Sequence, residues 1–303
     1  MTATAILLIV ASAFLHAGWN LISRRARSSA AFFLVSTLAG AALLSPGLIF
    51  YRFLLPDGLP PGFWALLLGT AFFMTLYFGA LAGAYRRGDI SVAYPLARSV
   101  PAIAVLAITV LLGRGHQISL QCMLGIVLVV VGCLAVPLRR FDQLHLQTYF
   151  NTTCGYALLA AIATAGYSLV DDEALRLLRA DDMSVREVVG VTVVYGCLQA
   201  VGAAFGLAIL VIPRRRGREE LRLVIRHRAN QALLAGVVMY VTYLMVLVSF
   251  AHAENVSYVL GFRQLSIPLG AALGIFILKE AADRPKLVGV AMTFVGLVLV
   301  ATG

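Results

Sequence analysis

The chain has 303 residues, of which 61% are hydrophobic and only 13% charged, with a mean hydropathy of +0.92. A soluble domain carries about 45–50% apolar and roughly 25% charged residues, so this composition excludes an ordinary soluble enzyme, a disordered chain and a secreted disulfide scaffold. The formal net charge of +10 would favour nucleic-acid binding in a soluble protein, but basic cytoplasmic loops account for it in the integral membrane protein that we predict.

Ten apolar spans follow one another along the chain. A membrane-crossing helix needs about 20 predominantly apolar residues, and short polar connections between the spans make neighbouring helices antiparallel. In chain order the spans cover residues 3–22, 31–54, 63–84, 91–112, 119–138, 152–170, 188–212, 230–250, 255–278 and 285–302. The two longest connections, 171–187 and 213–229, could each hold a short interfacial helix. The sequence therefore predicts an all-α integral membrane protein with ten transmembrane helices.

Basic residues set the expected orientation. Connections after odd-numbered spans hold 17 Lys and Arg residues, those after even-numbered spans hold five, and two arginines lie inside spans. Cytoplasmic loops carry the excess of Lys and Arg, so odd-numbered connections are predicted to face the cytoplasm and both termini the outside. We expect a multi-pass protein of a bacterial inner (plasma) membrane, with membrane lipid as a partner, no nucleic acid, and a monomer or homodimer as its assembly.

No motif for catalysis or metal binding is found in the sequence. It has no Gly-rich phosphate loop, no HExxH motif and no nucleophile–His–acid set at recognisable spacing. The four cysteines, Cys122, Cys133, Cys154 and Cys197, lie in apolar stretches without a CxxC pair, which favours packing roles. We therefore predict a protein that is not an enzyme and binds no cofactor or metal.

The two halves of the chain resemble each other. The segment 15–21 matches 163–169, 89–94 matches 253–258, 111–114 is similar to 277–280, and Gly125 and Gly132 match Gly289 and Gly296. Each half has five spans, and because five is odd the second half must enter the membrane inverted. We predict two five-helix repeats, residues 1–140 and 150–303, in the inverted arrangement typical of secondary transporters.

Three motifs in these repeats carry a resemblance to a known family. They are His-Ala-Gly-Trp-Asn at 16–20, Tyr-Pro-Leu-Ala-Arg at 94–98, and Arg-Gln-Leu-Ser at 263–266 leading to Lys279-Glu280. With the five-plus-five pattern, the chain resembles the drug/metabolite transporter superfamily, specifically its EamA-like ten-helix branch. A subgroup with a similar 94–98 segment is associated with phosphonate utilisation. Several relatives are described with cytoplasmic termini, opposite to our loop count, which we keep because the charge asymmetry is large.

Two arginines inside spans are the strongest candidates for substrate contact. Arg98 lies nine residues past Asp89, and Arg263 lies nine residues past Glu254, so both are expected roughly 13 Å deep, measured from opposite faces. A charge in the bilayer is costly and marks function by default. With every acidic residue expected in loops or at span ends, the pair predicts a positive cavity for a carboxylate, phosphate or phosphonate.

The other candidate site residues are polar or aromatic. His16 forms a stripe with Ser12 and Asn20, and Trp19 lies beside it; its imidazole could shuttle a coupling proton or simply bond to a neighbouring helix. Further cavity-lining candidates are Tyr94, Tyr77, Tyr167, Tyr243, Tyr258 and Gln264. Pro95, Pro101 and Pro268 are expected to kink their helices, and the carbonyls that they free could instead be what the two arginines satisfy.

We thus predict a secondary transporter that moves a small anionic or zwitterionic metabolite by alternating access. Two other functions stay open at this point. A flippase for a lipid-linked anion would need a lateral opening to lipid beside the arginines. A non-transporting scaffold or sensor would have no central cavity, with both arginines buried against backbone.

Overall fold

The computed structural model describes residues 2–25, 28–56, 58–87, 90–136, 138, 140, 151–180, 182–269, 275 and 282–303. Within its helices, the side chains of residues 17, 20–25, 87, 90–96 and 98 lie outside this description.

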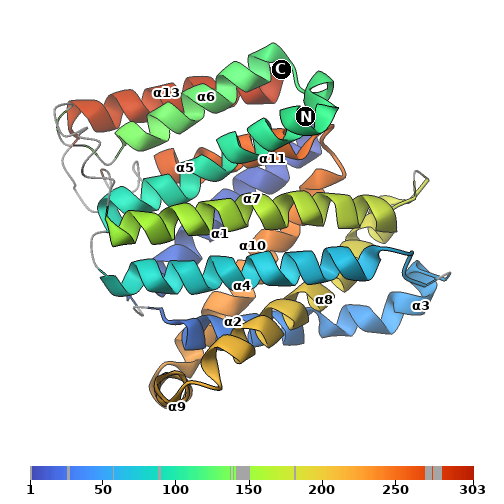
Figure 1. Ribbon diagram of the computed structural model, residues 1–303. Coiled ribbons are helices and arrows are strands. Elements are labelled where there is room, and N and C mark those ends of the chain that lie inside the picture. The colour runs from blue at the N-terminus through green and yellow to red at the C-terminus, as the bar shows by residue number, and fades with distance from the viewer. Residues whose placement is uncertain are drawn as a thin grey trace.

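The described residues form an all-α fold without a β-strand among them (Figure 1). The helices are α1 (Ala3–Arg25), α2 (Ala30–Leu44), α3 (Tyr51–Leu54), α4 (Phe63–Arg87), α5 (Ile90–Thr109), α6 (Leu120–Ala135), α7 (Thr152–Leu178), α8 (Val185–Val211), α9 (Arg215–His227), α10 (Ala229–Phe250), α11 (Val256–Phe262) and α13 (Arg284–Thr302). Short turns of other helical types are η1 (Ser45–Phe50), η2 (Val110–Arg114), η3 (Gly115–Gln117) and η6 (Arg263–Leu265).

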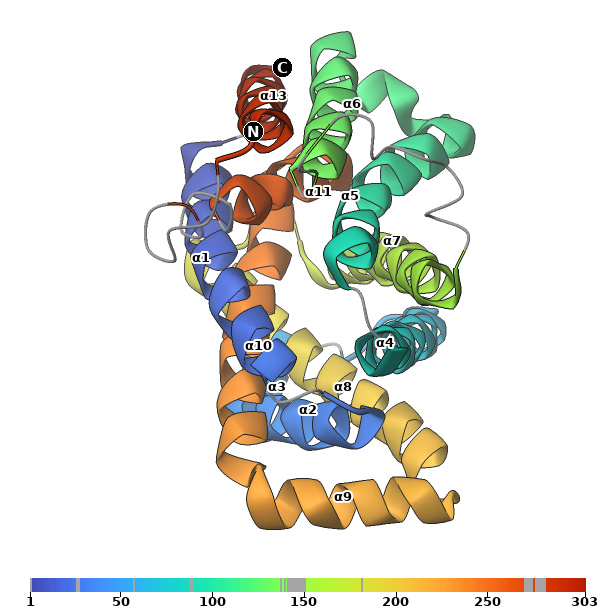
Figure 2. The same cartoon turned by 90° about the vertical axis from the view of Figure 1, so that its left-hand side faces the viewer.

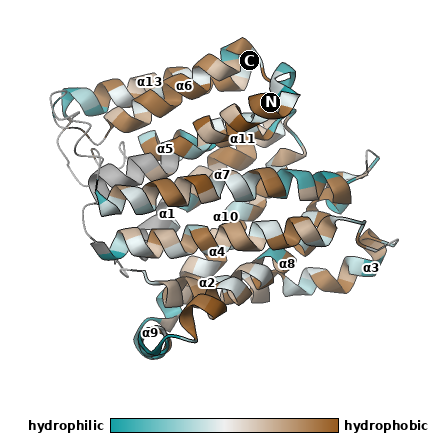
Figure 3. Ribbon diagram, viewed as in Figure 1, coloured by the Kyte–Doolittle hydropathy of each residue, from teal (hydrophilic) through white to brown (hydrophobic). Residues whose placement is uncertain are grey.

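Seven helical segments in the described part of the chain are long and apolar enough to cross a membrane. They are Ala30–Leu54, Phe63–Arg86, Ser99–Gln117, Thr152–Leu178, Val185–Val211, Ala229–Phe250 and Arg284–Thr302, and shorter apolar helices cover Ala3–His16 and Leu120–Ala135. Apolar colour runs along most of these helices (Figure 3), and Leu68 and Leu111 expose 72% and 84% of their surface. Such outward-facing apolar side chains suit lipid rather than water, so this is a multi-pass integral membrane protein.

Polar caps fix where several helices begin. Ser29, Ser119 and Asn151 each accept a hydrogen bond from a backbone N–H three residues further on. Ser184 forms a capping box with Glu187. A capping side chain satisfies an N–H that has no partner within the helix, and these four starts lie within about three residues of the predicted span starts.

The two long connections differ from one another. The connection 213–229 holds the expected extra helix: α9 lies nearly perpendicular to the membrane-crossing helices, seen end-on in Figure 1 and lengthwise in Figure 2. The prediction of a connection over residues 171–187 is wrong for its first half, because α7 continues to Leu178. Consequently Asp171 and Asp172 are part of the helix and not of an external loop.

Close helix crossings build the bundle. α6 and α13 cross at paired glycines and form a layer over α5 and α11 (Figure 2). Below them α4 packs along α7 and α8, α1 along α10, and α2 against α8 and α10. The space enclosed by α1, α4, α7 and α10 is the part of the bundle that holds the site.

Candidate functional site

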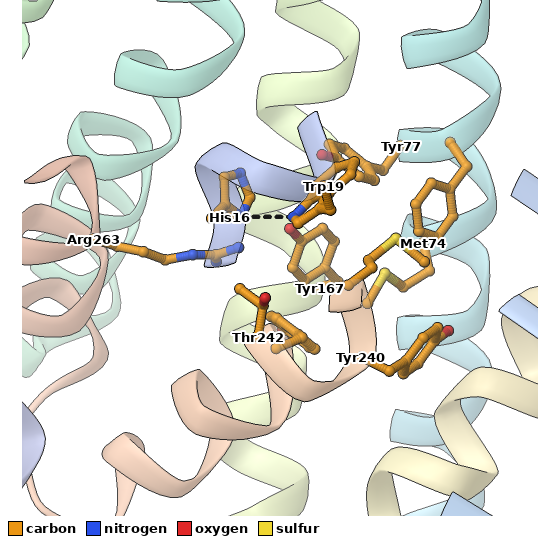
Figure 4. A pocket seen from close by; sticks show the side chains of 11 residues that line it. His16, Trp19, Met74, Tyr77, Tyr167, Tyr240, Thr242 and Arg263 are labelled. Carbon is orange, nitrogen blue, oxygen red and sulfur yellow. Dashed lines mark hydrogen bonds between the residues drawn. The ribbon is translucent and has the colours of Figure 1, made fainter. Parts of the chain in front are cut away.

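A pocket lies among α1, α4, α7, α10 and the η6 turn (Figure 4), with about 390 Å³ of empty space that includes open solvent. The lining residues are His16, Trp19, Met74, Tyr77, Phe78, Tyr167, Met239, Tyr240, Thr242, Tyr243 and Arg263. The lining is thus mostly aromatic and apolar, with a few polar groups converging on it.

The α1 side of the pocket is a hydrogen-bonded pair. The Trp19 indole Nε1 donates to His16 Nδ1 at 3.1 Å, and the two rings meet edge to face with centroids 4.9 Å apart. The pair is buried, with 4% of His16 and 2% of Trp19 exposed. An imidazole nitrogen that accepts a bond carries no proton, so His16 is deprotonated at Nδ1 in this arrangement.

A chain of tyrosines crosses the pocket wall from helix to helix. The rings of Tyr77 on α4 and Tyr167 on α7 lie edge to face at 5.7 Å, and those of Tyr167 and Tyr243 on α10 at 5.6 Å. Edge-to-face contacts of this kind stabilise a pair by about 0.5–1.5 kcal/mol beyond area burial. The three helices therefore present one connected aromatic surface to whatever occupies the pocket.

Arg263 lies where its helix is interrupted. α11 ends at Phe262, the η6 turn covers Arg263–Leu265, and helix resumes at Ser266. Pro268 has no N–H to donate to the carbonyl of Gln264, which fits an interruption here. A short 3₁₀ stretch inside a longer helix often marks a hinge or local strain.

The Arg263 guanidinium is buried beside an aromatic ring. Only 7% of the residue is exposed, and Cζ lies 5.4 Å from the centroid of the Tyr243 ring. Its side chain extends from the η6 side toward His16 and Thr242 (Figure 4). Nε has no hydrogen-bond partner within the described part of the chain. The cation–π contact offsets some of the desolvation cost, but a donor remains free for a ligand.

A buried carboxylate stands behind the pocket, contrary to the prediction that no span contains an acid. Asp171 on α7 is 0% exposed. It accepts hydrogen bonds of 2.5–2.7 Å from Thr70 on α4, Tyr195 and Gln199 on α8, and Tyr243 on α10. The sequence held a signal for this site. Leu175 and Leu178 continue the helical spacing of apolar residues past Asp171, which indicates that the helix extends beyond residue 170.

The structure brings six of the predicted site residues together. His16, Trp19, Tyr77, Tyr167, Tyr243 and Arg263 line the pocket. The side chains of Arg98, Tyr94, Asn20 and Pro95 lie outside the described residues.

Tyr258 and Gln264, also predicted to line the cavity, lie elsewhere. The Tyr258 hydroxyl accepts from Ser119 N at 3.2 Å and reaches Gly303 O at 3.3 Å, so this ring closes one end of the bundle. Gln264 Nε2 donates back to Leu260 O at 3.2 Å. Neither residue is among those that line the pocket.

Four lining residues were missed by sequence analysis, and Tyr240 completes the lining. Met74, Phe78 and Met239 are apolar residues inside apolar spans and carry no distinguishing signal, and a single hydroxyl such as that of Thr242 carries little. Pro101 is buried inside α5, which continues past it to Thr109.

Comparisons with known proteins place the chain in context. Residues 3–137 match the model of a family described as the EamA-like transporter family. No curated protein matches the chain. A solved structure titled only "Crystal structure of protein" superposes with a TM-score of 0.65, at 16% identity, over 99% of this chain and 96% of its own. At that identity the likeness shows a common fold.

Proposed function

We propose that the chain carries a small organic anion or zwitterion across the membrane by alternating access, because its residues 3–137 match the EamA-like transporter family. The ligand is of carboxylate, amino-acid, phosphate or phosphonate type. The observation that carries this proposal is Arg263, a buried cation on the pocket wall whose Nε has no hydrogen-bond partner within the described part of the chain.

The charge of the substrate follows from the cost of burying Arg263. A cation inside the bilayer needs water, a partner or a ligand to offset its desolvation. Within the described residues Arg263 forms no ion pair, and its contact is the Tyr243 ring. A guanidinium binds carboxylate and phosphate with two parallel hydrogen bonds, so an anionic group supplies what the site lacks.

The body of the substrate follows from the rest of the lining. Aromatic rings and two methionines, Met74 and Met239, dominate the wall. Thr242 and the His16–Trp19 pair supply a few polar atoms. Such a wall favours a ligand with an apolar or aromatic body attached to its anionic group, because apolar surface buried there gains about 25 cal/mol per Å². A central pocket also argues against the scaffold alternative, which requires none.

Ten spans in two inverted repeats, residues 1–140 and 150–303, are part of the proposal. Exchanging the halves maps α1 on α7 and α4 on α10. Helix pairs that pack together are exchanged in the same way: α1–α10 with α7–α4, and α2–α10 with α8–α4. The N-terminal and C-terminal helices end on one side of the bundle (Figure 1), as an even number of passes requires.

The glycine contacts of α6 and α13 fit the same exchange. A Cβ on Gly125 would lie 2.7 Å from the carbonyl of Gly296, and a Cβ on Gly296 would lie 2.7 Å from the carbonyl of Gly125. Gly132 and Gly289 make the corresponding reciprocal contact, at 2.7 and 2.6 Å. Reciprocal contacts of this kind are expected of two elements related by a two-fold axis.

Orientation and the second arginine complete the proposal. We assign the end of the bundle that holds the basic helix α9 to the cytoplasm of a bacterial cell, with both termini outside. Arg98 is assigned to the substrate path with Arg263, on the strength of its expected depth in the span and its place in the opposite half.

A ligand screen on the purified protein tests the function. Acetate, benzoate, phenylalanine, inorganic phosphate, methylphosphonate and phenylphosphonate are added in turn, and thermal stabilisation in detergent micelles is measured. At least one aromatic anion is expected to stabilise the wild type but not Arg263→Gln. If none of the six stabilises the wild type, or if Arg263→Gln responds equally, the anion pocket is refuted.

A further inference from the structure

The Asp171 carboxylate joins both halves of the protein through hydrogen bonds. Thr70 reaches it from the first half, at 2.5 Å, while Tyr195, Gln199 and Tyr243 reach it from the second. All four partners act as donors, which is the pattern that an ionised carboxylate requires. No cation contacts Asp171 within the described residues, where its four hydrogen-bond donors are all neutral groups.

Gln199 is equipped for both protonation states of this carboxylate. Its Nε2 donates to Asp171 Oδ2 at 2.7 Å and to Thr70 Oγ1 at 3.2 Å, while its Oε1 is buried without a hydrogen-bond partner among the described residues. An unpartnered buried acceptor is energetically unfavourable. Turning the amide over would place Oε1 against Asp171, where it could accept a hydrogen bond from a protonated carboxyl group. Within the described residues, the site therefore holds an unused acceptor beside a carboxyl group that could offer it a proton.

Tyr243 connects this carboxylate with the substrate pocket. Its hydroxyl donates to Asp171, and its ring both lines the pocket and lies 5.4 Å from Cζ of Arg263. Asp171 and Arg263 thus lie on either side of one side chain, with opposite charges. While Asp171 is ionised, its charge opposes the attraction of Arg263 for an anion in the pocket.

Other ionisable groups around Asp171 are accounted for by their own contacts. Tyr195 from α8 and Tyr243 from α10 face it directly, and Tyr240 lies within electrostatic range. On α7 itself, Asp172 pairs with Arg176, and Glu173 pairs with Arg114 of η2. The residue facing it from α4 is Thr70, which does not titrate. On α5, which also packs against α7, the side chain of Arg98 lies outside the described residues.

We propose that Asp171 is a proton-binding site coupled to the pocket, so that a proton and the anionic substrate bind together. This inference rests on the proposed function and names its coupling ion. The proton comes from water on the side to which the site opens, forms an O–H bond on Asp171, and returns to water on the other side. Because Asp171 is 0% exposed here, exchange with water requires the conformational change of the transport cycle.

The sign of the coupling follows from the charges. Protonation removes one negative charge near Arg263, so the pocket binds an anion more tightly when Asp171 is neutral. Linkage is reciprocal, so a bound anion must raise the proton affinity of Asp171 by the same factor. Coupled sites typically change each other's affinity about 5- to 150-fold. We expect the affinity for benzoate to decrease by a factor in that range as pH rises.

Calorimetry on the full-length protein in detergent micelles tests the proposal, with benzoate as the probe. Titrations run from about pH 5.5 to about pH 8.5, where benzoate stays ionised, in two buffers that differ in ionisation enthalpy. The wild type should take up protons on binding and should bind more weakly at high pH. Asp171→Asn should take up none, and should keep at every pH the affinity that the wild type has in acid.

Two controls separate Asp171 from its neighbours. Asp172→Asn removes the adjacent carboxylate, which has its own partner in Arg176, and should keep the proton uptake of the wild type. His16→Gln removes the histidine of the pocket and should keep the pH slope, whatever its absolute affinity. A flat profile in either control would move the proton site away from Asp171 and overturn the proposal.

The remaining outcomes are equally decisive. Asp171→Asn with a lowered melting temperature but an unchanged pH slope would make Asp171 a structural hydrogen-bonding hub only, which overturns the inference and leaves the anion pocket standing. If Asp171→Asn does not fold, the test is whether the wild type takes up protons when benzoate binds. A wild type that takes up none contradicts the proposal. If benzoate and the other five screened ligands fail to bind at any pH, the proposed function falls as well.

Discussion

The crossing of α6 and α13 depends on the absence of side chains at four glycines, and Gly132→Ala tests this dependence. A Cβ at position 132 would lie 2.7 Å from the carbonyl oxygen of Gly289, 2.5 Å from Oγ1 of Thr293 and 2.8 Å from its amide nitrogen. Ordinary Cβ contacts begin at about 3.4 Å. Two of these three atoms belong to the backbone of α13 and cannot turn aside as a flexible side chain would.

The two helices must therefore separate by several tenths of an ångström along the crossing. Inserting one methyl group into a well-packed interface costs about 1–3 kcal/mol. Part of this cost is recovered, because alanine is favoured over glycine inside a helix by roughly 0.8–1.0 kcal/mol. We expect a net loss of about 1 kcal/mol in the free energy of unfolding, which the thermal unfolding midpoint should register as a decrease.

Gly155→Ala provides a matched control for the same chemical change. Gly155 lies in the first turns of α7, is exposed, and would have no atom within 4 Å of an added Cβ. This substitution should leave the unfolding midpoint unchanged or raise it. Because α6 and α13 do not line the pocket, ligand affinity should be the same in both variants. An unfolding midpoint for Gly132→Ala equal to that of Gly155→Ala would refute the close crossing.

Three further predictions concern the pocket and the orientation. Arg263→Lys should weaken benzoate binding about tenfold in calorimetry, because a point charge replaces a bidentate hydrogen-bonding group at a cost of roughly 1.5 kcal/mol; wild-type affinity would argue against direct contact. With the exposed Trp64 changed to Phe, Trp19 is the one remaining tryptophan, and its emission should shift when benzoate binds. No shift at saturating ligand would place the ligand away from α1. A reporter active only in the cytoplasm, fused after Gly303, should stay silent, and a strong signal would reverse the proposed orientation.

Periodicity and charge predicted the helices well because lipid imposes a simple rule on them. The ranges of α4, α6, α8 and α10 lie within a few residues of the spans read from hydropathy. The end of α7 was missed for a physical reason. Asp171 and Asp172 look like a loop on any hydropathy scale, and only four donors from three other helices make the burial of Asp171 tolerable. Those donors are brought together by tertiary packing, which a single sequence does not contain.

Only part of the site was predicted, because tertiary packing also decides which side chains face the pocket. Arg263, His16 and Trp19 stood out as polar or bulky groups at mid-depth in apolar spans, where their cost implies a function. Tyr258 has the same chemistry as Tyr243, yet it packs against Ser119 and Gly303. Which tyrosines face the pocket depends on how each helix is rotated about its axis, and hydropathy alone does not fix that rotation.

The interruption at Arg263 has a mechanical consequence. A straight helix resists bending because each turn is held by hydrogen bonds that must lengthen or break. At the η6 turn the hydrogen bonds change from the α-helical to the 3₁₀ pattern, whose geometry is poorer, so we expect α11 to bend there more readily than within a regular helix. The guanidinium that we propose to bind the substrate is attached at this turn. We therefore expect a displacement of the bound anion to act on the backbone at the point where the helical geometry changes.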